Sequence, residues 1–322
     1  MAPAGQPRSP SVIPALVALG AAILFWSCVP LLLKYFTHRL DAWTVNGLRY
    51  LFAALFWLPY VVRHRREIPV GSRIWRDALP PAGIHLVGQV LFGLCPYFND
   101  ATVINFVSRA AFLFTTLTGF LLLREERALG RQPLFWAGVA ATAGGLAAMY
   151  AGGIGTRSTS AFGMLLLLAM AAFWGFYSVL VRRFMKPYSI RLSFSVISLY
   201  AAPGLLALMF AVGDWRKALA LGPGYWGLIW LSAILGIALG HTLFYRAIHT
   251  LGPVASEGSL LLIPFTTAVL AYFLLDERLG RLQWLGGVIL VAGCFLLLRA
   301  TLRARGRAAA DDHAEAMAPS PR

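Results

Sequence analysis

Charged residues that could carry chemistry lie inside strongly apolar stretches of this sequence. Glu257 and Pro264 both fall in the run GPVASEGSLLLIP, and His241 lies in the apolar stretch before it. A helical hairpin would bring His241 and Glu257 to a similar depth, where a buried histidine and carboxylate can relay a proton or hold a cation. The alternatives are a carboxylate that favours a helix N-terminus and a packed, hydrogen-bonded histidine.

Two arginines lie in other apolar stretches. Arg109 stands 148 residues before Glu257 and has the opposite charge. A cavity with an arginine on one side and a carboxylate on the other suits a zwitterion such as an amino acid. A structural ion pair and an arginine that extends toward the polar surface are the alternatives. For Arg49, within NGLRYLF, the open interpretations are a structural anchor and a substrate contact.

Polar residues also gather on and just after the third apolar stretch: His85, Gln89, Tyr97, Asn99 and Asp100. We expect some of them to face one shared pocket with residues of the eighth stretch. The aromatic pairs Tyr97-Phe98 and Phe244-Tyr245 can stack on a planar or apolar ligand, or simply pack in the core. The candidate binding residues are therefore Glu257, Arg109, His241, Gln89, Tyr97, Asn99, Tyr245 and Arg49, with Pro264 as a kink that allows gating.

The elements that must position these residues are membrane spans. The chain is 59% hydrophobic and 13% charged, whereas a soluble domain has about 45–50% apolar and about 25% charged residues. Apolar stretches of about 20 residues recur, which is the length that crosses a bilayer as a helix. We expect ten spans, at residues 12–35, 42–62, 79–98, 101–123, 133–151, 161–181, 191–212, 224–246, 254–275 and 282–299.

The basic residues indicate how the spans are oriented. The net charge of +15 lies mainly in alternate loops, so it indicates cytoplasmic loops and not a nucleic-acid surface. We expect both termini in the cytoplasm of a multi-pass protein of the inner (plasma) membrane. Residues 1–11 would form a short cytoplasmic segment, and the polar residues 301–322 a disordered cytoplasmic tail.

An internal repeat divides the chain into two halves. At an offset of 148 residues, Phe25-Trp26 corresponds to Phe173-Trp174 and Trp136 corresponds to Trp284. Residues 12–151 and 161–300 would thus each hold five spans. Because five is odd, the second half crosses the membrane in the opposite sense. Such inverted repeats bind their substrate near the midplane between the halves.

The second half resembles a known transporter family. The opening GHTLFYRA from Gly240, the spacing of Pro264 and Glu277, and the turn DERLG before QWLGG carry the resemblance, and Ser108–Gly130 shows it more faintly. The chain resembles EamA-type transporters of the drug/metabolite transporter superfamily. The resemblance implies ten helices, two inverted repeats and transport of small metabolites. Residues 101–123, the corresponding span of the first half, contain no proline, so the first half lacks a counterpart of Pro264.

Motifs for enzymatic chemistry are absent from the sequence. It has no phosphate-binding loop, HExxH motif or nucleophile elbow, so we expect neither an enzyme nor a bound cofactor. The leading hypothesis is a gradient-driven secondary transporter (a permease or exporter) of small organic metabolites such as amino acids or drugs, with proton coupling as an option. The alternative is a lipid or polyisoprenoid-carrier flippase, or an assembly subunit in the membrane.

Two smaller features predict helix contacts. Glu126 and Glu277 precede the fifth and tenth spans, where each would cap the helix that follows it. Glycine pairs seven residues apart, Gly138/Gly145 and Gly286/Gly293, indicate close helix packing. This packing would lie between the halves or between the protomers of a homodimer.

Overall fold

The computed structural model describes residues 12–68, 71–122, 130–153, 160–251 and 259–317, and the ordered elements in these ranges are all helical. The first half contains α1 (Val12–Phe36), α2 (Ala42–Arg63), η1 (Arg65–Glu67), α3 (Ile74–Asp77), α4 (Leu79–Leu94), η2 (Cys95–Tyr97), α5 (Ala101–Ser108), α6 (Ala111–Leu122) and α7 (Pro133–Gly153). The second contains α8 (Ala161–Phe184), α9 (Ile190–Val212), α10 (Arg216–Leu219), α11 (Pro223–Ala233), η4 (Ile234–Leu239), α12 (Gly240–Leu251), η5 (Leu260–Leu262), α14 (Ile263–Leu275) and α15 (Arg281–Met317).

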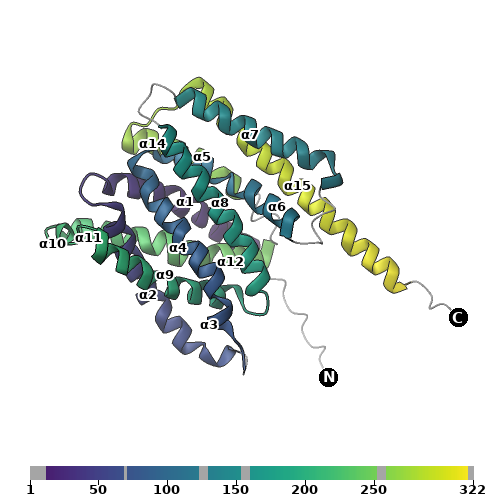
Figure 1. The fold of residues 1–322 in the computed structure, drawn as a ribbon, viewed down its shortest axis with the longest axis horizontal. Helices are drawn as coiled ribbons and strands as arrows, with labels where there is room; N and C mark the ends of the chain where they lie inside the picture. Colours follow the sequence, from purple (N-terminus) through teal and green to yellow (C-terminus); the bar gives the residue numbers. More distant parts are fainter. Residues whose placement is uncertain (1–11, 69–70, 123–129, 154–159, 252–258, 318–322) are drawn as a thin grey trace.

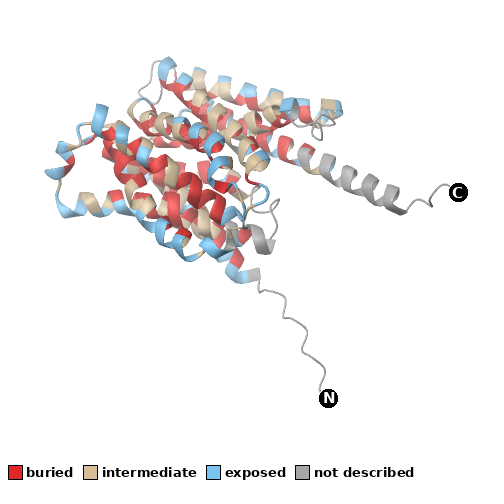
Figure 2. Ribbon diagram, turned by 60° about the horizontal axis from the view of Figure 1, so that its bottom comes forward, coloured by how far each residue is buried: buried red, intermediate tan, exposed pale blue. Residues whose placement is uncertain are grey.

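The helices form a membrane-spanning bundle. Within the described residues, nine helices are long and apolar enough to cross a membrane, and the apolar helix Leu260–Leu275 is shorter. The ninth span that we expected begins at residue 254, inside the range 252–258 that the structure does not describe, so only its later part is seen. Large apolar side chains such as Leu55, Phe210 and Phe273 face outward, and exposed residues lie around the outside of the bundle (Figure 2). A surface this apolar suits lipid.

The two halves interlock instead of lying apart. Helix α2 packs along α9, and α7 packs along α15. Both are pairs of equivalent helices, one from each repeat. Helix α1 also packs against α12, and α4 against α8. Figure 1 shows α7 and α15 side by side along one edge of the bundle, and the other helices surround its centre.

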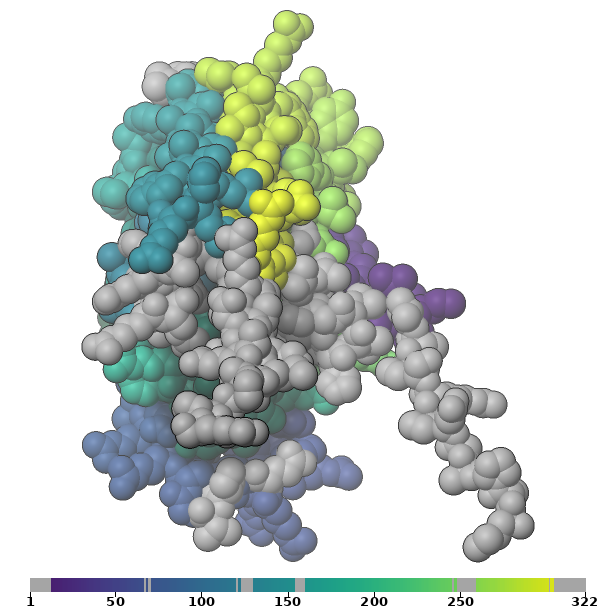
Figure 3. Space-filling model, turned by 90° about the vertical axis from the view of Figure 1, so that its right-hand side faces the viewer, coloured from purple at the N-terminus to yellow at the C-terminus, as the bar shows by residue number. Residues whose placement is uncertain are grey.

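Glycines allow the backbones of α7 and α15 to touch. A Cβ added to Gly145 would lie 2.6 Å from Gly286 O, and one added to Gly293 would lie 2.5 Å from Thr142 N. Figure 3 looks onto this face, where α7 in teal lies against α15 in yellow. The predicted close contact at the spaced glycines is therefore confirmed, and it joins the two halves of one chain.

Two spans contain interruptions near the centre of the bundle. The fourth span consists of α5 and α6, which are separated at Arg109-Ala110 although no proline is present. In the second half, the 3₁₀ turn η5 leads into α14, and Pro264 occupies the first turn of that helix. A proline at this position sacrifices no intrahelical hydrogen bond. The kink expected from Pro264 inside a continuous helix is thus replaced by a helix start.

A third irregularity lies in the eighth span. Its middle, η4, is a π-helical turn between α11 and α12. Such turns are common at functional sites, because they shift side chains and carbonyls out of the regular helical pattern.

The chain's C-terminal segment differs from expectation. Residues 301–317 continue helix α15, which reaches past the end of α7 in Figure 1. We expected this segment to be disordered because it is polar. Its abundant alanine and arginine have high helix propensity, which can extend a helix that has already formed in the membrane.

Candidate functional site

A cavity of about 390 Å³ lies among the helices of the two halves. Its lining comes from α1, α2, α4, α5, α6, α8, α9, η4, α12 and η5. The volume falls within the range of about 300–1,000 Å³ that small-molecule sites occupy. The position between repeats is the one that the inverted-repeat pattern predicts for a binding site.

Two tryptophans form equivalent parts of the cavity wall. Trp26 and Trp174 both line it, and they lie 148 residues apart. Trp26 Nε1 donates a hydrogen bond of 3.1 Å to Gly236 O. A Cβ added to Gly88 would lie 2.8 Å from Trp174 Cδ1, and Gly88 is 148 residues before Gly236. Each tryptophan therefore packs on a glycine of the other half, and the repeat symmetry extends to the site itself.

Four of the candidate residues line this cavity: Arg49, Gln89, Arg109 and His241. Arg49 projects from α2, and Arg109 lies in the break between α5 and α6. The carbonyl oxygen of Arg109 accepts a hydrogen bond of 3.3 Å from Cys294 Sγ of α15, which braces the break. These four candidates, chosen from the sequence, come from four separate spans and line one cavity.

The two histidines of the cavity are closely packed. The His241 ring stacks on Phe194 with centroids 4.0 Å apart, and its edge meets Trp26 at 5.1 Å. His85 Nε2 lies 2.8 Å from Tyr50 Oη. These contacts fit the packed histidine that we gave as the alternative to a proton relay. Glu257, the expected partner of His241, lies outside the described residues.

Tyr97 and Asn99 do not belong to the described lining of the cavity. Tyr97 Oη donates a hydrogen bond of 2.5 Å to Leu40 O. Asn99 Nδ2 donates to Cys95 O at 3.1 Å and to Gly163 O at 3.2 Å. Both side chains join helix ends to one another at one end of the bundle. Tyr245 belongs to α12, but its side chain is outside what the structure describes.

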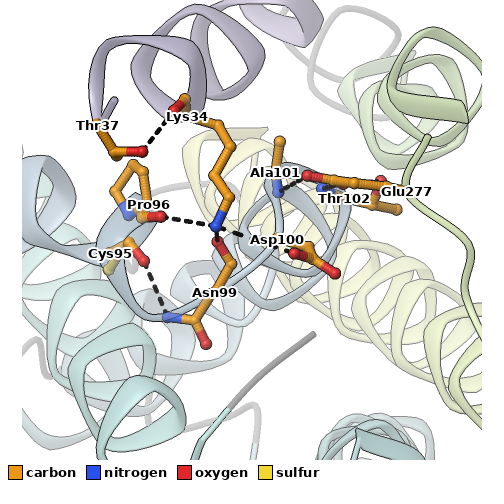
Figure 4. Close-up of polar contacts among 9 residues, drawn as sticks. All are labelled: Lys34, Thr37, Cys95, Pro96, Asn99, Asp100, Ala101, Thr102 and Glu277. Carbon is orange, nitrogen blue, oxygen red and sulfur yellow. Dashed lines mark hydrogen bonds and ion pairs between the residues drawn. The ribbon is translucent and has the colours of Figure 1, made fainter. Parts of the chain in front are cut away.

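Glu277 joins the two halves at the same end of the bundle. Its carboxylate accepts hydrogen bonds from Ala101 N at 2.7 Å, from Thr102 N at 2.9 Å and from Thr102 Oγ1 at 2.8 Å (Figure 4). We expected Glu277 to cap the helix that follows it, and this prediction is wrong. It caps α5 of the other half, while Gln283 Oε1 accepts from Gly280 N at the start of α15. Glu126 lies outside the described residues.

Lys34 and Asp100 complete this polar cluster. Lys34 Nζ donates hydrogen bonds of 2.9 Å to both Pro96 O and Asn99 O, and it is 3.9 Å from Asp100 Oδ1 (Figure 4). Burial and the nearby Glu277 carboxylate raise the pKa of Asp100 to about 7, and Lys34 only partly opposes them. The Lys34 ammonium points mainly at backbone carbonyls, so it neutralises the negative charge of Asp100 only weakly.

The raised pKa of Asp100 predicts a pH dependence of stability. An ordinary aspartate titrates near pH 4, so the folded chain holds this proton more tightly than the unfolded chain. Its contribution to stability is complete below about pH 4 and is lost as the pH rises through about 7. Asp100→Asn should therefore unfold like the wild type at pH 4 and be roughly 1 kcal/mol more stable at pH 8, a modest gain because the group is partly exposed.

Thermal unfolding in detergent at a series of pH values measures this difference. Asp276→Asn is the control, because it removes an exposed carboxylate whose charge partner is Arg278. If the difference in unfolding temperature between Asp100→Asn and the wild type is the same at pH 4 and pH 8, the prediction is contradicted.

Several cavity residues were absent from the sequence-based candidates, among them Trp26, Asn105, Trp174, Tyr177 and Phe194. The two tryptophans could have been selected from the sequence, because they occupy equivalent positions in the two repeats. We used that equivalence only to detect the duplication. Nothing in the sequence distinguishes Tyr177 and Phe194 from the other aromatic residues, since the chain contains 21 phenylalanines and 11 tyrosines. Asn105, whose Nδ2 donates to Thr267 Oγ1 at 2.5 Å, could have been found as a polar residue inside a span.

Comparison with known proteins agrees with this architecture. The model of the EamA-like transporter family matches residues 13–150 and again residues 161–299. The chain belongs to the EamA-like transporter family. An uncharacterized transporter from Archaeoglobus fulgidus is 22% identical over 286 residues, which cover 86% of this chain and 95% of that protein. A solved crystal structure with 18% identity matches with a TM-score of 0.59, over 90% of this chain and 97% of its own.

The family assignment makes the chain a multi-pass membrane protein of a transporter family with two EamA repeats. The fold expected from the sequence is confirmed at this level. Members of the EamA-like transporter family are transporters and not enzymes, which agrees with the absence of enzyme motifs.

Proposed function

We propose that the protein is a secondary transporter that moves a small organic metabolite across the inner (plasma) membrane by alternating access. The observation that carries the proposal is the cavity between two repeats, lined equivalently by Trp26 and Trp174. A site at such an interface can be exposed to either side when the halves rock against each other. Its aromatic walls, with polar side chains such as Gln89 and Asn105 among them, suit a small organic solute.

The described conformation would be open toward the cytoplasm. Ser178, near the C-terminal end of α8, lines the cavity and is exposed. With both termini in the cytoplasm, as the basic loops favour, this end of α8 lies on the inner side. The cluster of Lys34, Asp100 and Glu277 then lies at the outer side. There its hydrogen bonds hold α1, the start of α5 and the α14–α15 turn together.

Thiol labelling tests the orientation and the access route. In a variant without the native Cys28, Cys95 and Cys294, we expect Ser178→Cys to react with a membrane-impermeant maleimide in inside-out vesicles and to be protected in right-side-out vesicles. Tyr35→Cys is the matched control, because Tyr35 is exposed near the opposite end of the bundle, and it should show the reverse pattern. Reaction of both from the same side would contradict the proposed orientation.

Counterflow in proteoliposomes tests transport itself. Vesicles loaded with unlabelled metabolite pools should accumulate a labelled pool member faster than protein-free vesicles. A proton gradient imposed across the same vesicles tests the proton coupling that His241 and Glu257 suggested. Metabolite pools that give no exchange, in protein whose unfolding is cooperative, would argue against the proposed function.

A further inference from the structure

Arg49 is a buried charge that faces the cavity. Its side chain lies on α2, is 2% exposed and forms part of the cavity wall. An arginine within a membrane span costs about 2.5–3.5 kcal/mol on insertion scales, so such residues are normally paired or functional. What its guanidinium contacts therefore decides whether Arg49 is a structural anchor or a binding group.

One side of the guanidinium is held by the protein. Arg49 Nε donates a hydrogen bond of 3.1 Å to Ser232 Oγ on α11, and Ser232 Oγ donates in turn to Ile229 O at 2.8 Å. A Cβ added to Gly236 in the π-helical turn would lie 3.1 Å from Arg49 Nη2 and 2.8 Å from Val29 Cγ2. Because Gly236 has no side chain, the guanidinium of Arg49 has room to lie against it. These contacts fix its direction, and they account for the anchoring role.

The other side of the guanidinium is unsatisfied. Among the residues that the structure describes, Arg49 Nη1 is buried and has no hydrogen-bond partner. The described lining of the cavity contains no aspartate or glutamate. A fixed, desolvated guanidinium with an open donor on Nη1 suits a carboxylate, because a charged oxygen both accepts from that donor and neutralises the arginine.

We propose that Arg49 binds the carboxylate of the transported solute, and that this solute is a small organic anion with a flat apolar body. The inference rests on the proposed transport function and names its substrate class. The body of the anion would lie against the aromatic walls formed by Trp26, Phe92 and Trp174. Flat apolar groups pack well on such rings. The carboxylate would in turn neutralise the charge of Arg49 inside the membrane.

Three probes of nearly identical shape test this proposal: 3-phenylpropanoate, 3-phenylpropanamide and 3-phenylpropylamine. They share the ring and the chain and differ in the charge of the end group. Equilibrium binding of tritiated 3-phenylpropanoate to the full-length protein in detergent, with the other two as competitors, gives three affinities. We expect the wild type to bind the acid about tenfold more tightly than the amide, and the amine most weakly.

Substitutions assign the preference to Arg49. Arg49→Gln should weaken binding of the acid about tenfold and leave the affinity for the amide unchanged. Arg63→Gln is the matched control, since it removes the same charge from the exposed end of the same helix. If Arg49→Gln does not fold, Gly236→Ala provides the test instead. This variant keeps the charge of Arg49 but displaces its guanidinium, so it should weaken binding of the acid and not of the amide.

The outcomes separate this inference from the proposed function. Equal affinities for acid and amide, failure of the acid to bind, or an acid preference that survives Arg49→Gln would each overturn the inference, even if counterflow of other solutes occurs. The expected binding pattern without counterflow of 3-phenylpropanoate would instead leave an anion site and refute transport.

Discussion

Replacing Gly145 by alanine is expected to lower the free energy of unfolding by about 1–3 kcal/mol, the usual effect of overpacking. The added Cβ would lie 2.6 Å from Gly286 O and 2.7 Å from Leu290 Cα. Both are backbone atoms, so no side-chain rotation can relieve the contact, and α7 and α15 must move apart. Gly145→Leu should prevent this packing altogether and leave little folded protein, because the two helices join the halves along one edge of the bundle.

The neighbouring glycine supplies the control for this prediction. A Cβ added to Gly144 meets no atom within 4 Å, so Gly144→Ala should be neutral or slightly stabilising through its higher helix propensity. Size-exclusion profiles and thermal unfolding of the three variants in one detergent measure the difference. If Gly145→Ala unfolds at the same temperature as Gly144→Ala, α7 and α15 do not pack as closely as the structure shows.

The sequence was a sufficient guide to this part of the fold. Hydropathy marks each span, because a segment in lipid must be apolar along its whole length. The glycines at 138, 145, 286 and 293 predicted a close contact, because only glycine allows backbones to approach so far. The irregular elements were harder. Nothing local in Arg109-Ala110 or in Ile234–Leu239 announces a break or a π turn, since such features arise from packing against other helices.

The site was predictable only in part. Charges inside spans are expensive, so Arg49 and Arg109 could be selected from the sequence alone, and both reach the cavity. Tyr97 and Asn99 were selected because they lie near Gln89 in the chain. They follow the end of α4, where the bundle needs hydrogen-bond partners for its helix ends, and they serve that purpose. The depth of a polar residue within its span therefore predicts whether it lines the cavity better than its proximity in sequence to another candidate does.

Glu277 shows what sequence proximity conceals. A glutamate in the turn before a helix normally caps that helix, because its carboxylate is close to the first free N–H groups. Here Asp276 adopts the left-handed conformation with φ of 51°. The following carboxylate reaches the N-terminus of α5 in the other half. The residue therefore stabilises the contact between repeats at one end of the bundle, a role that only the assembled fold defines.

Glu277→Ala is expected to destabilise the folded protein by about 2–4 kcal/mol. The substitution leaves Ala101 N, Thr102 N and Thr102 Oγ1 without their acceptor. Hydrogen bonds to a charged group contribute about 1.5–3 kcal/mol each, and a lost helix cap costs about 0.5–2 kcal/mol, while water can replace part of both. Thermal and chemical unfolding in detergent at pH 8 measure the loss.

A matched pair of neutral variants separates the cap from simple loss of charge. Glu277→Gln and Asp276→Asn each remove one negative charge from adjacent positions, and asparagine tolerates the left-handed conformation. Glu277→Gln should destabilise the protein, while Asp276→Asn should have little effect because its carboxylate is exposed. Glu277→Gln should also reduce the pH dependence caused by Asp100, since the Glu277 charge helps to raise the pKa of that carboxyl. If Glu277→Gln and Asp276→Asn unfold at the same temperature at every pH, Glu277 does not join the repeats through α5.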